Sequence, residues 1–294
     1  MAYWIFSSAV FGSDQPLPTI AMFPDYRAAL DKLLKHDPES QIIGASGTTQ
    51  AAIVLGLWLH ANGHVRAGSA TSDSKDDEPN TEFMACIHSL TLIALYHPVH
   101  QVRNAASVLA GSVLHADPGD DDRLHILYDL LENCDYAQLK ALAVTWLREE
   151  IIEAAASGGA GSNLFTTPQA LETVQYAVFP SVVSLRELDI PGVVDLLAQN
   201  SPFLLQAVNF ALFLWGSDKW KHILPGNMAS TVMERWFRPV QDAVETVERA
   251  ILPGGELANQ ELGPLHSDLV VLRGRMKQLG ETDGFKVFET AGKD

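Results

Sequence analysis

Apolar residues recur along most of the chain at the three- and four-residue spacing of amphipathic helices. The clearest example begins with residues 97–111, HPVHQVRNAASVLAG, where one apolar face contains Val99, Val102, Ala106, Leu109 and Val113. Arg103 and Asn104 project away from that face. Pro98 suits the first turn of a helix, because a proline there loses no helical hydrogen bond. The pattern predicts a packing helix over residues 98–116.

The same periodicity predicts helices over most of the sequence, whereas alternating strand-like runs between turn residues are scarce. The expected helices span residues 25–36, 47–62, 81–96, 98–116, 119–133, 135–156, 168–187, 191–199, 201–216, 227–251 and 258–279. The helix over 201–216 is apolar around most of its circumference, so we expect it to be the most buried. Two polar stretches, residues 67–80 and 156–163, lack this periodicity and are expected to form flexible inserts.

Short connections between successive helices favour antiparallel pairs. Helix pairs of roughly 35–45 residues are typical of an α-solenoid, whose units bury their apolar faces against their neighbours. The sequence therefore predicts an all-α fold, a HEAT-like α-solenoid of antiparallel helix pairs that forms a single domain over residues 1–294. No residue pattern repeats strictly enough to count the units, so an irregular all-α domain is the alternative.

Composition narrows the expected partners and location. The formal net charge of −16 disfavours nucleic acid and anionic membranes as partners and favours basic protein surfaces. Cys86 and Cys134 are the only cysteines, which fits a reducing cytoplasmic and/or nuclear location, and each is expected to be a buried small hydrophobe. No Lys or Arg precedes Arg27, so the positive segment of a secretory signal is missing, and the apolar run at 51–59 is too short to cross a bilayer. We expect a soluble protein without a membrane partner.

One long run resembles a known family. Residues 97–151, HPVHQVRNAASVLAGSVLHADPGDDDRLHILYDLLENCDYAQLKALAVTWLREEI, are followed by a polar insert and further helices. Over roughly residues 81–280 this succession of helical segments is similar to the C-terminal part of the glomulin and fungal Yap-binding-protein family, whose members are generally longer. The resemblance implies a HEAT-like solenoid without catalytic activity. It also implies a protein partner, either the RING subunit of a cullin-based ubiquitin ligase or a stress-responsive Yap-type transcription factor, and a link to kinetochores.

Motifs of common enzyme classes are absent from the sequence. It contains no G-x-S-x-G, no Walker-type phosphate loop and no H-E-x-x-H, and Leu164 replaces the last glycine that a dinucleotide-binding loop needs. We therefore expect no catalytic residue and no cofactor. The alternative is an all-α enzyme with a dispersed active site, for which the first candidates are His97, His100, Asp121 and Glu149.

The histidines and clustered aspartates do not form a recognisable metal motif. His60 and His64 are separated by an Asn-Gly pair that ends helices, and His97 and His100 lack a nearby Cys or Glu to complete a ligand set. Four aspartates lack the alternating spacing of a calcium loop and are expected to favour a helix N-terminus instead: Asp117, Asp120, Asp121 and Asp122. We expect no metal site.

Residues 215–238 reverse the acidic charge of the chain. Four basic side chains there face only two acidic ones, and the segment holds three of the six tryptophans. Because Trp and Arg are enriched at binding hot spots, the candidate partner-binding residues are Trp220, Arg235, Trp236 and Arg238. The alternative is that the tryptophans pack consecutive helices, which we favour for Trp215. The acidic remainder of the chain could instead attract a basic partner.

Overall fold

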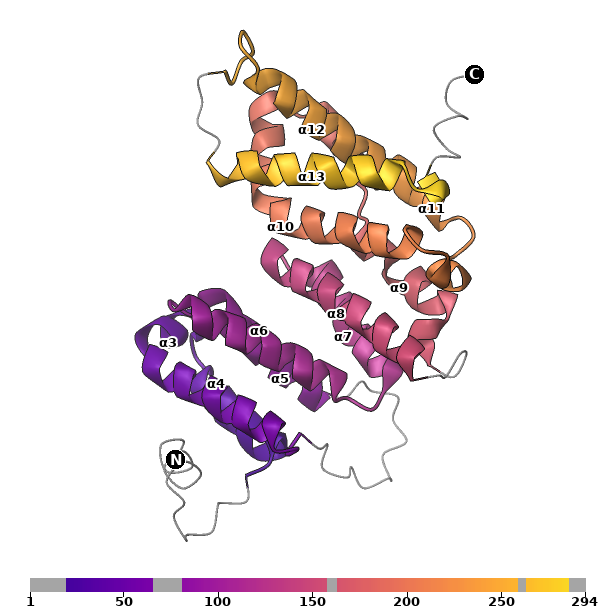
Figure 1. Ribbon diagram of the computed structural model, residues 1–294. Coiled ribbons are helices and arrows are strands. Elements are labelled where there is room, and N and C mark those ends of the chain that lie inside the picture. The colour runs from indigo at the N-terminus through magenta and orange to yellow at the C-terminus, as the bar shows by residue number, and fades with distance from the viewer. Residues whose placement is uncertain (1–19, 66–80, 158–162, 259–262, 286–294) are drawn as a thin grey trace. The chain divides into compact units, whose positions relative to one another are not determined.

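The computed structural model describes residues 20–65, 81–157, 163–258 and 263–285 (Figure 1). Every regular element in these ranges is a helix and none is a strand, which confirms the all-α fold class. The chain divides into two compact units, Met1–Ile126 and Leu127–Asp294. The HEAT-like solenoid and its continuity as a single domain stay predictions. The expected insert at 67–80 lies outside the described residues, as does most of the one at 156–163.

The described part of the first unit, residues 20–65 and 81–126, contains six complete helical segments, and α7 (Asp120–Asn133) crosses the boundary with the second unit. The six are η1 (Met22–Tyr26), α2 (Arg27–Leu33), α3 (Pro38–Gly44), α4 (Ser46–Ala61), α5 (Thr81–Tyr96) and α6 (His100–His115). Sequence periodicity missed the short α3, although its start signal is present. The Asp37 side chain accepts a hydrogen bond from the Ser40 N–H at 3.2 Å, and Pro38 occupies the first turn.

Helix α6 packs against α5 on one side and α4 on the other. Four of the five residues of its predicted apolar face are buried: Val102, Ala106, Leu109 and Val113. The fifth, Val99, is exposed because it is the N-cap residue, and Pro98 precedes the helix instead of opening it. The predicted face is therefore confirmed from Val102 onward and is wrong at its start.

Helices α4 and α6 meet most closely at Gly56. A β-carbon placed on Gly56 would overlap Leu109 Cδ2 and would lie 2.6 Å from the hydroxyl oxygen of Tyr26. Any larger residue would have to push α6 or Tyr26 away, because interiors are packed too densely to absorb an added methyl group. The missing side chain at Gly56 thus sets the distance between the two helices.

His97 joins three elements of the first unit. Its Nε2 lies 3.1 Å from the carbonyl oxygen of Ser46, and its Nδ1 accepts the N–H of Val99 at 3.1 Å. Arg103 donates to the carbonyl oxygen of His97 at 2.8 Å and so ties α6 to the loop before it. His97 lies outside the helix, as expected, and is almost fully buried.

The two cysteines differ in burial. Cys86 is fully buried on α5, as expected, and burial raises the pKa of its thiol to about 12. Cys134 is only half-buried, so the expectation of a buried side chain is wrong for this residue. Its position just after α7 leaves one side of the thiol accessible to solvent, and partial burial still raises its pKa.

The second unit is organised around the long helix α10 (Ile190–Trp215), which contacts α8 (Ala137–Ala156), α12 (Arg238–Ile251) and α13 (Pro264–Gly280). Figure 1 shows α8, α10 and α13 following one another in space, with α12 beside α13. Shorter segments complete the unit: η2 (Leu164–Thr166), α9 (Pro168–Val178), η3 (Val183–Glu187), η4 (Asp218–Ile223), α11 (Met228–Val232) and η5 (Met233–Phe237).

Several predicted boundaries in the second unit need correction. The helices expected at 191–199 and 201–216 are one helix, α10, which continues through Pro202. The helix expected over 168–187 ends at Val178, because the residue before Pro180 is driven out of the helical conformation. No residue between Ser201 and Trp215 is fully exposed, which confirms a deeply buried helix there.

No single helix in the described ranges is both long enough and apolar enough to cross a membrane. Helices α3 and α4 pass that test of length and composition only when taken together, and they are bent by 95° relative to each other.

Candidate protein-binding surface

The three tryptophans of residues 215–238 belong to one connected aromatic cluster in the second unit. Trp236 packs edge-on against Phe179 with 5.2 Å between ring centroids, and Trp220 lies 4.7 Å from Phe213. Trp236 is 0% exposed and Trp220 6% exposed. Neither ring presents surface to a partner, because each is enclosed in the core that joins α9, α10 and η5. Of the four predicted partner-binding residues, Arg235 and Arg238 therefore remain candidates for direct contact with a partner.

Arg235 lies at the edge of this core and stacks on an exposed tyrosine. Its guanidinium carbon is 4.5 Å from the ring centroid of Tyr176, which is 47% exposed on α9. The Val182 N–H donates to the carbonyl oxygen of Arg235 at 3.0 Å, and this bond holds the exposed Val183 near the arginine. We call Tyr176, Val183 and Arg235 the Tyr176 patch.

The guanidinium of Arg235 makes no hydrogen bond or ion pair with any described residue, and its Nε is buried without a partner. Stacking on an aromatic face is a favourable environment for arginine, because the ring quadrupole attracts the cation. It holds the group in place without using its N–H donors, so the outer nitrogens remain available to an acceptor from outside.

The other basic residues of the predicted segment are placed differently. Arg238 opens α12 and is half-buried, so it lies one turn from Arg235. Lys221 pairs with Asp218 at 2.7 Å, which raises the pKa of the lysine, and Lys219 lies over the ring of Trp220 at 4.3 Å. The structure thus separates a solvated lysine cluster on η4 from the arginine beside Tyr176.

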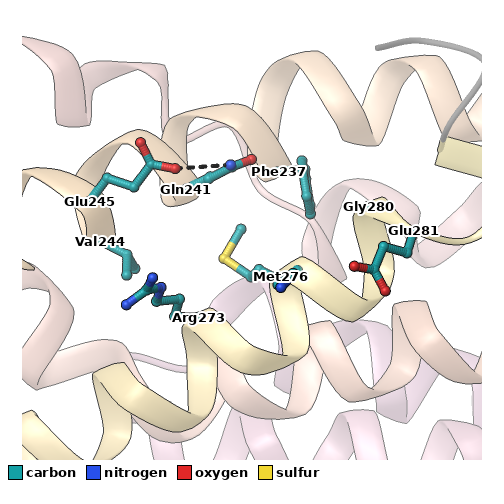
Figure 2. Close-up of a pocket in the computed structure, with 9 residues that line it drawn as sticks. Phe237, Gln241, Val244, Glu245, Arg273, Met276, Gly280 and Glu281 are labelled. Atoms are coloured by element: carbon teal, nitrogen blue, oxygen red, sulfur yellow. Dashed lines mark hydrogen bonds between the residues drawn. The ribbon is translucent and has the colours of Figure 1, made fainter.

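A groove lies between α12 and α13 in the second unit (Figure 2). It consists of two cavities of about 450 and about 460 Å³ that share Glu245 and Arg273. Gln241 donates to Glu245 at 3.0 Å along one rim, and Arg273 pairs with Glu248 at 3.3 Å across it. Because the rims carry both signs of charge, the groove shows no charge preference for a partner.

The candidates for a dispersed active site lie in different local environments. Both ring nitrogens of His97 are committed to backbone groups, whereas His100 is exposed at the start of α6 and contacts Asn104 at 3.3 Å. Asp121 is exposed on α7 and Glu149 is exposed on α8. Among the described residues, no group of three or more His, Cys, Asp or Glu side chains could hold a metal ion.

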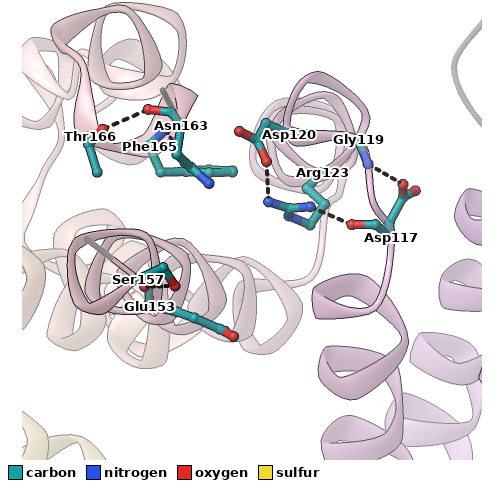
Figure 3. A network of polar contacts seen from close by, with 9 residues as sticks. All are labelled: Asp117, Gly119, Asp120, Arg123, Glu153, Ser157, Asn163, Phe165 and Thr166. Atoms are coloured by element: carbon teal, nitrogen blue, oxygen red, sulfur yellow. Dashed lines mark hydrogen bonds and ion pairs between the residues drawn. The ribbon is translucent and has the colours of Figure 1, made fainter. Parts of the chain in front are cut away.

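The aspartates around the start of α7 are organised by an arginine (Figure 3). Arg123 donates to the carboxylate of Asp120 at 2.5 Å and to the backbone carbonyl of Asp117. The Asp117 carboxylate accepts the Gly119 N–H at 2.9 Å, which closes the turn. Asp120, Asp121 and Asp122 occupy the first turn of α7, the expected position for carboxylates that favour the helix dipole.

Sequence reasoning missed Tyr176, which supplies the support for Arg235. The signal that could have found it is its phase: Leu171, Val174 and Val178 form the buried stripe of α9, and Tyr176 falls outside that stripe. A large aromatic residue on the polar face of an amphipathic helix indicates a contact that the helix itself does not make.

Comparison with known proteins yields one match. The model of a family described as an uncharacterised protein family, YAP/Alf4/glomulin, matches residues 2–273. No curated protein and no solved structure matches the chain.

Proposed function

Because the chain belongs to the YAP/Alf4/glomulin family, we propose that it is a non-catalytic helical scaffold that binds another protein. The family is generally non-enzymatic. The observation that carries the proposal at the level of residues is the half-buried Arg235, stacked on an exposed tyrosine and without a polar partner among the described residues. Tyr and Arg are the residues most enriched, with Trp, where truncation weakens protein complexes.

Two partners are proposed from the family. One is a Yap-type transcription factor of a stress response, with a link to kinetochores, and the other is the RING subunit of a cullin-based ubiquitin ligase. Either partner fits a scaffold that acts in the cytoplasm and/or the nucleus, which the scarcity of cysteine supports. The low share of basic residues argues against nucleic acid as the direct ligand.

Within the scaffold, we propose that the Tyr176 patch contacts the partner and that Arg238 contributes from the next turn. Burial of Trp220 and Trp236 gives these rings a supporting role, because Trp220 holds η4 against α10 and Trp236 holds η5 against Phe179 at the end of α9. Their replacement would alter binding only by disturbing the packing beneath the patch.

The test is a titration of the purified chain with each candidate partner, by calorimetry or by interferometry. We expect Arg235→Ala to weaken binding by about tenfold, or about 1.4 kcal/mol, which exceeds the effect of truncating most interface residues. Arg275→Ala is the matched control: Arg275 is an exposed arginine on α13, outside the patch as defined, and it donates to Gln278 at 3.3 Å. We expect it to change affinity by less than about twofold.

If Arg235→Ala and Arg275→Ala lose the same affinity, the effect comes from net charge alone. If both variants bind the partner as tightly as the wild-type chain, the Tyr176 patch is not the binding site. No binding of the wild-type chain to either protein would rule out both named partners.

A further inference from the structure

We propose that the Tyr176 patch recognises a carboxylate side chain within an apolar-flanked, acidic segment of the partner. The inference rests on the proposed function and specifies the chemistry of its ligand. Arg235 would bind the carboxylate through its outer guanidinium nitrogens, and Val183 and the exposed part of the Tyr176 ring would contact the neighbouring apolar residue.

The first argument is the unused donor capacity of Arg235. Two other arginines of the second unit form ion pairs: Arg186 donates to Asp242 through two nitrogens at 3.3 and 2.9 Å, and Arg273 pairs with Glu248. Arg235 has neither kind of contact among the described residues. A planar guanidinium matches a carboxylate through two parallel hydrogen bonds, and bonds between charged groups are roughly twice as strong as neutral ones.

The second argument is that the group is already held in place. The Tyr176 ring supports one face of the guanidinium at 4.5 Å, and the Arg235 backbone is fixed by its bond to Val182. A ligand that meets a pre-oriented arginine loses less conformational entropy than one that must order a free side chain. The buried Nε further restricts the approach to the outer nitrogens.

The third argument is charge complementarity. The chain carries a net charge of −16, so an acidic segment is repelled by most of its surface. A cation without an acidic partner can still attract such a segment locally, and the Tyr176 patch provides a cation of this kind next to exposed apolar surface. Repulsion elsewhere would then favour one binding position and disfavour non-specific contact.

The experiment uses a fluorescein-labelled, C-terminally amidated peptide of repeated Glu-Leu-Ser units, titrated with the full chain and followed by fluorescence anisotropy. The amide removes the terminal carboxylate, so that only side chains can bind. A Gln-Leu-Ser peptide keeps the size and the apolar residues but removes the charge. We expect the glutamine peptide to bind at least about tenfold more weakly than the glutamate peptide. Binding of the glutamate peptide should weaken when the salt concentration rises from about 50 to about 300 mM.

Variants of the chain locate the site. Arg235→Ala should weaken binding of the glutamate peptide by about tenfold. Arg235→Lys should recover only part of that affinity, because an ammonium cannot form the two paired hydrogen bonds. Arg275→Ala should leave the affinity unchanged. Val270→Asp changes an exposed residue that lines the α12–α13 groove, and it should also have no effect. Circular dichroism and thermal melting of each variant check the fold, and Tyr176→Phe keeps the supporting ring if Tyr176→Ala does not fold.

Three results would overturn the inference: equal affinity for the two peptides, loss of binding in Val270→Asp but not in Arg235→Ala, or full recovery by Arg235→Lys. The proposed function fails on a different result, namely no binding of the wild-type chain to either candidate partner. If a candidate partner binds the wild-type chain and Arg235→Ala equally well, the scaffold remains and the carboxylate site is excluded.

Discussion

Replacing Leu109 by alanine should lower the free energy of unfolding by about 2–5 kcal/mol. Leu109 is 0% exposed on α6, and its Cδ2 occupies the point where α6 comes closest to α4. The change removes buried apolar atoms and leaves a cavity between the two helices, because their backbones are held by neighbouring contacts and collapse only partly.

The structure predicts that this cost depends on residue 56. Gly56→Ala alone should destabilise by about 1–3 kcal/mol, because its new methyl group overlaps Leu109 Cδ2, although better helix propensity offsets this by about 1 kcal/mol. In the double variant, alanine at 109 removes the overlap with Leu109 Cδ2 but not the one with Tyr26, and the methyl at 56 fills part of the cavity. The double variant should therefore be less destabilised than the sum of the single variants, by more than about 0.5 kcal/mol.

Urea unfolding gives these free energies, with fluorescence of Trp58 on α4 and hydrogen exchange of α4 and α6 peptides as reporters of the first unit. Val108→Ala is the matched control, because Val108 is the preceding residue on α6 and is 62% exposed. It should change stability by less than about 0.5 kcal/mol. The reasoning is refuted if Leu109→Ala costs no more than this control, or if the effects at 56 and 109 simply add.

Two further predictions concern buried polar groups of the same unit. Tyr26→Phe should raise the free energy of unfolding by about 1 kcal/mol in urea titrations, because the Tyr26 hydroxyl is buried without a partner among the described residues; a loss of stability would show that the hydroxyl is bonded. For Cys86, burial raises the thiol pKa from 9.0 to about 12, so the folded state keeps a proton that the unfolded chain loses. Stability should fall as the pH rises from about 9 to about 12, and Cys86→Ala should flatten that part of the profile; identical slopes for both proteins would contradict this.

Helix positions were largely accessible from the sequence because they follow from local rules. The helix over 81–96 was placed correctly, and those at 119–133 and 135–156 differ from α7 and α8 by one or two residues at their starts. Apolar periodicity and turn residues set these limits, and both act over a few residues. Local rules failed at Pro202, where α10 continues through the proline and packs against α8 and α13.

The candidate site shows the limit of the same reasoning. Sequence singled out Arg235 and Trp236 together, because both residue types are common in binding surfaces. Adjacent residues on a helix point in different directions, and only the packing of η5 against α9 and Phe179 shows that Trp236 faces the core and Arg235 faces Tyr176. Tyr176 is remote in sequence, so no local pattern could pair it with the arginine.

By itself, the sequence determined that the protein is all-α, where most of its helices lie and which family it resembles. These properties depend on spacing between near neighbours along the chain, which a single helix already expresses. Only the tertiary structure decided which tryptophans are buried, which arginine lacks a polar partner and how closely α4 approaches α6. Those properties depend on contacts between residues far apart in sequence, and such contacts exist only once the helices have packed.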